Sequence, residues 1–235
     1  MGGPMQLTPW AFGLAEKLLA TELPRRWAHV RGTARHANRI GLLILDGDEQ
    51  DLLVAAAVSH DIGYARSLVR YGFHPLDGAT FVARVGAPDR LTRLVANHSA
   101  SAFAAGIRGM SEEMSRFPDE STPVRDALWY CDCVTDPNGN PIAFEARMAE
   151  IRRRHGLDSV NVRALDAGGL AARTDAVRRC EQRMRAAARR QPAQARPCQG
   201  PARANRAGPW QRTRSEPPAG NSPCGAPAGA PGDPA

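Results

Sequence analysis

Six side chains of the kinds that bind transition metals recur between residues 29 and 132 of this 235-residue chain. They are four imidazoles and two carboxylates: His29, His60, Asp61, His74, His98 and Asp132. Imidazole nitrogens mixed with carboxylate oxygens suit iron, manganese, zinc or another first-row divalent ion, with waters in the open positions. Such an ion lowers the pKa of bound water from near 16 to roughly 7, so hydroxide would be available at neutral pH without a strong protein base.

The six residues lie in apolar segments more often than a chance distribution would place them there. Only two other histidines occur in the chain, His36 and His155. Histidines scattered over a solvated surface would not favour segments as apolar as those that carry the six residues. The pattern therefore predicts that the six side chains converge on a common metal site.

The central pair of the set is His60-Asp61, which follows the apolar run Ala55–Val58 and precedes Gly63. Adjacent residues on a helix point about 100° apart, so the two side chains share a direction only near a helix end. We therefore expect a buried helix to end at this pair. The dipeptide alone is weak support for a metal site, and the order of the other four residues strengthens it.

The elements that must position these residues are predicted to be helices. Nearly every apolar segment repeats at helical spacing, and none alternates convincingly as a strand would. Thr8 is expected to cap the first helix, and Pro75 to occupy the first position of the helix after His74. The expected helices cover about 9–19, 24–45, 49–60, segments starting at 74 and 88, 100–107, 111–117, a segment starting at 123, 143–154 and 167–189. The fold class is an all-α bundle.

The composition changes at about Gln191, where Pro, Ala, Gly and Arg replace the aliphatic residues. Such a segment cannot bury enough apolar surface to offset its chain entropy. We predict one helical domain over residues 1–190, with its core at about 25–137. Residues 191–235 are predicted to be a disordered low-complexity tail.

The net charge of +7 belongs mostly to that tail. Residues 186–235 contain 7 basic and 2 acidic side chains, whereas residues 1–185 contain 24 and 22. A nucleic-acid-binding domain normally carries its positive excess on the fold, so specific nucleic-acid binding is not expected.

The location of the protein is predicted from what the sequence does not contain. No apolar run is long enough to span a bilayer, and the first residues do not form a secretory signal. The five cysteines have no paired spacing of the kind that zinc ribbons or disulfide frameworks use. We expect a cytoplasmic protein with reduced thiols and no membrane partner.

The order of four of these residues, His29, His60-Asp61 and then Asp132, resembles the HD-domain superfamily of metal-dependent phosphohydrolases, whose members are all-helical. Trp27–Val30 is similar to the family's first-histidine helix, and His60–Gly63 matches its central HDIG stretch. Asp132 resembles the late aspartate on a buried helix. The resemblance covers about residues 27–137 and implies an HD-domain-like helical bundle.

His74 and His98 resemble the additional ligands of HD proteins with two metals, such as diadenosine-polyphosphate hydrolases and cyclic-dinucleotide phosphodiesterases. The resemblance implies one ion on His29, His60, Asp61 and Asp132, with Asp61 bridging to a second ion on His74 and His98. The chain departs from the cyclic-di-GMP branch. It has Asn97-His98 in place of paired histidines, lacks a Gly-Tyr-Pro motif, and has Tyr64 where a lysine often follows HDIG. These departures argue against that substrate.

The activity that the resemblance implies is cleavage of a phosphoester or phosphoanhydride bond in a nucleotide or other small phosphorylated substrate. One or two divalent ions would supply the hydroxide, with iron or manganese expected ahead of zinc, nickel, cobalt or magnesium. Asp61 is the candidate catalytic proton acceptor. Arg66 and Arg70 are candidates for binding the substrate phosphate, although they could equally be two surface arginines.

Two other functions stay open. Some HD proteins with a di-iron site activate oxygen and cleave C–C or C–P bonds, and His74 with His98 is compatible with that chemistry. An HD fold that only binds a ligand is the third alternative. The sequence does not identify the substrate, the native metal, a homodimer or the role of the tail.

Each candidate residue also has an ordinary structural explanation. His29 could be a hydrogen-bonded core histidine, His74 a helix cap and His98 the partner of a helix dipole. His36 is the rival of His29, two turns along the same face, but its flanks fit a solvated position better. Asp77 and Asn97 stay open as groups that contact the ligands or the substrate.

Overall fold

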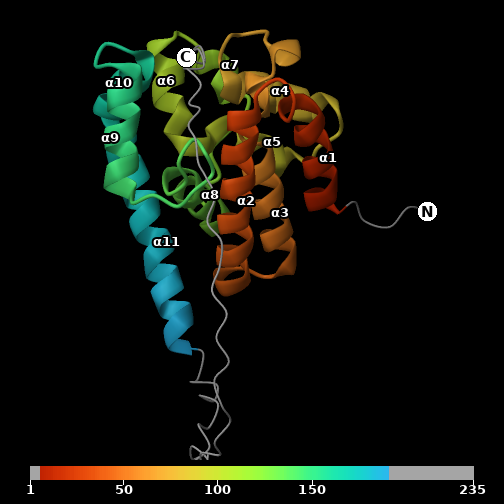
Figure 1. The fold of residues 1–235 in the computed structure, drawn as a ribbon, viewed down its shortest axis with the longest axis vertical. Helices are drawn as coiled ribbons and strands as arrows, with labels where there is room; N and C mark the ends of the chain where they lie inside the picture. Colours follow the sequence, from red (N-terminus) through yellow and green to blue (C-terminus); the bar gives the residue numbers. More distant parts are fainter. Residues whose placement is uncertain (1–5, 191–235) are drawn as a thin grey trace, which may run out of the picture. The chain divides into compact units, whose positions relative to one another are not determined.

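The computed structural model describes residues 6–190, and Figure 1 shows the arrangement of their helices. The predicted tail of residues 191–235 lies outside the described residues. The elements are α1 (Leu7–Leu19), α2 (Pro24–Ile44), α3 (Gly47–Ser59), η1 (Ile62–Tyr64), η2 (Arg66–Leu68), α4 (His74–Arg84), α5 (Asp89–Asn97), η3 (His98–Ala100), α6 (Ser101–Ile107), α7 (Ser111–Ser115), α8 (Pro123–Cys133), α9 (Phe144–His155), α10 (Val160–Ala164), η4 (Leu165–Gly169) and α11 (Leu170–Arg190). Among the described residues, β-pairing is limited to the isolated bridge between Thr135 and Pro141. The predicted all-α fold is confirmed.

Helix α3 forms the centre of the core. Every residue from Leu52 to Ser59 is buried, because α3 is covered by α1, α2, α5 and α8. Its N-terminus is capped by Asp46, whose carboxylate accepts the Glu49 amide at 3.0 Å. Burying a polar group without a partner costs free energy, so the polar pair that follows this buried helix is expected to make specific contacts.

Helix α2 packs along α3 and begins at Pro24, as predicted. Its buried face includes Val30, Ala34, Ala37 and Gly41, whose small side chains allow close approach. Figure 1 shows α2 and α3 side by side, joined by a tight turn at their lower ends. This packing places residues near the start of α2 opposite the C-terminal end of α3.

The expected cap of α1 was wrong. The helix begins at Leu7, and Thr8 lies inside it. The amides of Leu7 and Thr8 donate to the carboxylate of Asp51 on α3, at 2.9 and 3.0 Å. A carboxylate from another helix therefore satisfies this N-terminus, which local sequence could not reveal.

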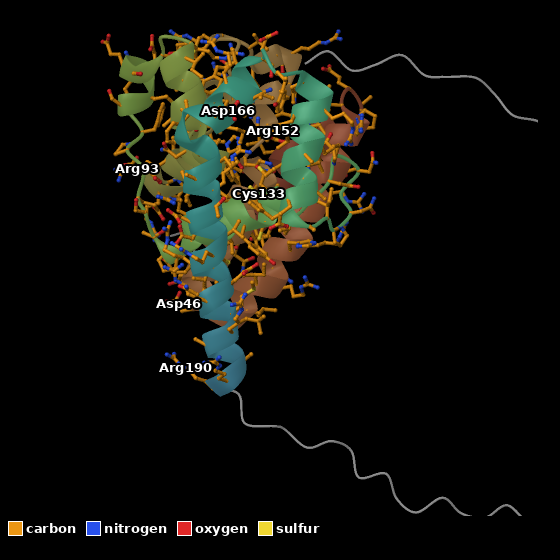
Figure 2. The ribbon with its side chains drawn as sticks, turned by 90° about the vertical axis from the view of Figure 1, so that its left-hand side faces the viewer. Asp46, Arg93, Cys133, Arg152, Asp166 and Arg190 are labelled. Atoms are coloured by element: carbon orange, nitrogen blue, oxygen red, sulfur yellow. The ribbon has the colours of Figure 1, made fainter. Side chains whose placement is uncertain are left out.

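The C-terminal helices differ from the predicted single helix over 167–189. A short helix α10 comes first, and η4 separates it from α11. The break falls at Gly168, whose φ of 125° favours glycine, and a Cβ there would lie 2.6 Å from the ring of Phe103. Helix α11 packs on α8 and α2, and Figure 2 shows it running past Cys133 at the end of α8.

Candidate metal centre

The end of α3 re-aims the central His-Asp pair as predicted. His60 still has helical backbone angles, whereas Asp61 leaves the helix at φ −106° and ψ 7°. The change brings Asp61 Oδ2 within 3.3 Å of His60 Nε2. Both side chains are buried, so neither can reach bulk water for a partner.

The structure brings all six predicted side chains together, in two adjoining groups. The first group is His29, His60 and Asp132, and the second is Asp61, His74 and His98. Within each group the potential ligand atoms lie within 4.8 Å of one another. The residues come from α2, α8, the start of α4 and the ends of α3 and α5, so only the tertiary packing assembles them.

Asp61 lies between the two groups and offers one oxygen to each. Its Oδ2 is 3.3 Å from His60 Nε2 and 3.8 Å from His29 Nε2. Its Oδ1 is 3.5 Å from His74 Nε2 and 3.7 Å from His98 Nε2. Asp132 completes the first group, with Oδ1 3.0 Å from His29 Nε2. This is the arrangement of a bridging carboxylate.

Backbone carbonyls orient three of the imidazoles. The Nδ1–H of His60 donates to Ala57 O at 2.8 Å, and that of His98 to Val95 O at 2.6 Å. The Nδ1–H of His29 donates to Asp136 O at 3.0 Å. A carbonyl can only accept, so Nδ1 carries a proton in each of these rings, and Nε2 is the nitrogen that faces the other candidate ligands.

Asp136 is a residue that the sequence interpretation missed. Its carboxylate accepts the amides of Asn138 and Asn140, each at 2.8 Å, which shapes the loop after α8. Gly139 in this loop has φ 82° and packs directly against Gly32 of α2. The loop thereby presents the Asp136 carbonyl to His29. The run Asp-Pro-Asn-Gly at 136–139 was a turn signal that pointed to this loop.

The second group depends on a close approach between η1 and α4. A Cβ at Gly63 would overlap the His74 carbonyl and lie 2.6 Å from the Gly78 amide nitrogen. The ring of His74 also stacks on Tyr64, with centroids 3.9 Å apart and planes at 17°. Tyr64, which departs from the pattern at this position, therefore orients a candidate ligand.

Asp77 and Asn97 shape the segments beside the second group. The carboxylate of Asp77 accepts the amides of Arg70, Tyr71 and Phe73, between 2.7 and 3.0 Å. The amide of Asn97 donates to the carbonyl of Arg93 at 3.1 Å. Both residues thus hold the chain that leads to or from a candidate ligand.

The charges around His60 stabilise one another. Burial by itself lowers the pKa of His60, but the carboxylates of Asp61 and Asp132 outweigh it and raise the pKa to about 9. Burial alone raises the pKa of Asp61, yet the charges of His60 and Arg26 hold it well below its usual range. In the protein without metal, a proton on His60 supplies the positive charge that the carboxylates require.

The second group carries no such proton. Burial, with the charge of nearby His60, lowers the pKa of His98 to about 4. Burial also lowers the pKa of His74 well below its ordinary value. Both imidazoles are therefore neutral at pH 7, the form in which histidine binds a metal.

The atoms of both groups fit a metal ion. His60 Nε2 is buried, and its contact with Asp61 Oδ2 at 3.3 Å does not have the geometry of a regular hydrogen bond. The Nε2 atoms of His74 and His98 face each other at 3.1 Å. Two imidazole nitrogens at roughly 2.1 Å from one ion, at near-octahedral angles, are separated by about 3 Å. An ion in each group, in place of the proton on His60, would satisfy these nitrogen atoms.

The arginine that contacts the site is one that the sequence interpretation did not select. Arg26 lies one helical turn before His29, and its Nη1 is 2.8 Å from Asp61 Oδ2. Its guanidinium also lies over the ring of Tyr64, 4.0 Å from the centroid. The i, i+3 spacing to His29 was the available signal. The predicted Arg66 and Arg70 are exposed, and Arg70 lies over Tyr71.

The remaining histidines lie outside both groups. His36 is half-buried and lines a cavity of about 630 Å³ with Tyr130 and Phe144. His155 contacts Asn161 on the surface. His29 is therefore the histidine of α2 that meets the other candidate ligands, as predicted.

These observations define a class: an all-helical chain with two adjoining His/Asp groups suited to divalent metals. The family model for the HD domain matches residues 26–128, which agrees with the resemblance found in the sequence. The match ends one turn before Asp132, whose place in the site rests on the sequence resemblance and on its contact with His29. No curated protein and no solved structure was found to match the chain. Among the described residues, no helix has the length and apolar character needed to cross a membrane.

Proposed function

We propose that this protein is a metal-dependent phosphohydrolase that acts on a small phosphorylated substrate such as a nucleotide. The observation that carries the proposal is the position of Asp61. One of its oxygens faces His29 and His60, and the other faces His74 and His98. A shared carboxylate is what two ions need if they are to act on one phosphoryl group.

In this proposal His29, His60 and Asp132 hold one ion, and His74 and His98 hold a second, with Asp61 shared. Iron or manganese suits these nitrogen and oxygen donors. When bound, the ions lower the pKa of water and neutralise charge that develops on the phosphoryl oxygens. The protein's own contribution is to fix the ligand atoms and to position the substrate.

Arg26 is the residue we assign to the substrate phosphate. Its side chain is 24% exposed and pairs with Asp61 through one nitrogen. A guanidinium has five N–H donors, so others stay available for a phosphoryl oxygen. The stacking on Tyr64 keeps the planar group in one orientation. Arg66 and Arg70 stay predictions for contacts with more distant parts of a substrate.

The experiment measures metal and phosphate together. We expect the purified protein, stripped and then titrated with Mn²⁺, to bind about two equivalents and to release phosphate from nucleotide substrates only when loaded. His60→Ala should abolish both binding to the first group and turnover. His36→Ala removes a histidine outside both groups and is the matched control, which should keep both.

Other results would assign the site differently. Oxygen consumption by the iron-loaded protein with a phosphonate or polyol, without phosphate release from esters, would favour the oxygenase. Wild-type protein that binds no Mn²⁺, Fe²⁺ or Zn²⁺ would overturn the proposal and leave a non-catalytic HD protein.

A further inference from the structure

The turn that follows His98 has an unusual backbone. Ser99 (φ 50°, ψ 39°) and Ala100 (φ 58°, ψ 35°) are consecutive left-handed residues, and neither is glycine. Residues with a Cβ occupy this region at a cost in free energy, and two in succession add to that cost. Both residues are buried. The surrounding structure must hold this turn in place.

The turn places a hydroxyl on one of the candidate ligands. Ser99 Oγ donates a short hydrogen bond to Asp132 Oδ2. The other oxygen, Oδ1, is then the one that lies 3.0 Å from His29 Nε2 and 3.9 Å from His60 Nε2. A carboxylate with one oxygen occupied by a donor presents the other in a defined direction.

The same turn connects the two groups. Its preceding residue, His98, belongs to the second group, whereas the hydroxyl of Ser99 acts on Asp132 of the first. A single segment of chain thus sets the position of a ligand in each group. In a helical backbone the Ser99 side chain would take a different direction, because the φ and ψ of a residue set where its Cβ points.

Helix α11 stabilises the turn from outside the HD match. Arg173 Nε donates to the Ser99 carbonyl at 2.9 Å. This part-buried bond gives the Ser99 carbonyl a donor. Figure 2 shows α11 passing the end of α8, where Cys133 follows Asp132 in sequence. The C-terminal helix therefore reaches the site through the backbone of Ser99.

We propose that Ser99 is a positioning residue for Asp132, and that Arg173 keeps Ser99 in the left-handed conformation that this role requires. The inference rests on the proposed metal centre. It assigns a function to α11, which lies beyond residues 26–128, and it explains why two left-handed residues are retained beside a candidate ligand. A purely structural turn would keep its fold, and the metal affinity of the first group, with glycine at position 99.

The test compares substitutions that separate the effect of the Ser99 hydroxyl from the effect of the left-handed backbone. Ser99→Gly favours the left-handed conformation but removes the hydroxyl, whereas Ala100→Gly relieves the same conformation and leaves the hydroxyl in place. Mn²⁺ titration of the stripped full-length protein gives the number of ions and their affinities. The unfolding temperature of the metal-free protein measures the stability of the fold independently of metal binding.

For Ser99→Gly we expect an unfolding temperature at or above that of the wild type, with at least roughly tenfold weaker Mn²⁺ binding at one of the two equivalents. Ala100→Gly should keep both affinities. Arg173→Ala should weaken the same equivalent, and adding it to Ser99→Gly should change little more. Arg178→Ala, an exposed arginine paired with Asp175 on the same helix, is the control for charge.

Two outcomes would overturn the inference for different reasons. Wild-type affinity at both equivalents in Ser99→Gly would show that the hydroxyl does not position Asp132, and the metal centre would stand. Wild-type protein that binds no Mn²⁺ would remove the metal centre itself, and the inference with it.

Discussion

The two groups of candidate ligands are held by the chain in different ways. His29 and His60 of the first group come from the interior of α2 and the end of the buried α3, and their side chains are about 1% exposed. His74 of the second group begins α4, and its side chain is 22% exposed. Backbone carbonyls orient both imidazoles of the first group and His98 of the second, whereas Tyr64 stacks on His74. The first group is closed except at Asp132, whose side chain is 13% exposed, and the second is open to solvent at His74.

This difference predicts different roles for the ions of the two groups. A closed group with fixed ligand atoms loses its ion slowly, because exchange requires the surrounding helices to open. An open group exchanges its ion and admits substrate more easily. We therefore expect the first ion to be the tighter one, and substrate to approach from the side of His74, Tyr64 and Arg26. The predictions below test the comparison, from the largest expected effect to the smallest.

The largest effect is expected from Asp61→Asn, which keeps the shape of the side chain but removes its charge. Both groups share this residue, so both equivalents of Mn²⁺ should be lost and turnover should fall by roughly a thousandfold or more. Metal analysis and phosphate release measure the two effects. Turnover at wild-type rate in this variant would rule out a shared carboxylate.

The second prediction separates the groups. His98→Ala removes a ligand of the second group only, so about one equivalent should remain, bound with the affinity of the tighter wild-type ion. Elemental analysis per chain is the measurement. Loss of both ions in this variant would show that the groups are not independent, and that the first does not form a site by itself.

The third prediction concerns the substrate side. Arg26→Gln removes the charge that we assign to the phosphate and should lower kcat/KM by roughly ten- to a hundredfold, while both ions stay bound. Steady-state kinetics with parallel metal analysis measure this. Arg66→Gln is the matched comparison on an exposed arginine near the same site. A larger loss there than at Arg26 would restore the assignment made from the sequence.

The smallest effect is a difference in pH dependence. The pKa of His60 in the folded protein without metal is raised from 6.5 to about 9, so its proton stabilises the fold below pH 6.5 and this contribution is lost as the pH rises to 9. The pKa of His98 is lowered from 6.5 to about 4, so below pH 6.5 the unfolded chain binds a proton that the folded protein does not. The fold therefore loses stability at His98 as the pH falls from 6.5 towards 4, which is the opposite dependence.

An ion that binds His60 must displace that proton. At pH 7 the first equivalent of Mn²⁺ should release about one proton, and the second almost none. Titration in a weakly buffered solution measures the release for each equivalent. Equal release for both would contradict the difference in charge between the two groups.

Much of the site could be predicted from the sequence because its residue types are rare and several of them stand at helix ends. The six candidate ligands were identified from residue type and order, and the HDIG stretch indicated where α3 stops. Arg26 was not identified, because its i, i+3 spacing to His29 is a weak signal in a chain with many arginines. Asp136 acts through its carbonyl and Ser99 through a left-handed turn, and neither role has a signature in residue type.

The amino-acid sequence by itself determined the helical class and the identity of the candidate ligands, since helical periodicity and a His-Asp pair at a helix end are local properties. Only the tertiary structure decided how the ligands divide into two groups, which oxygen of Asp61 faces each group, and that α11 reaches the site through Arg173. These features depend on contacts between residues separated by tens of positions, and such contacts follow from the packing of whole helices rather than from any short stretch of chain.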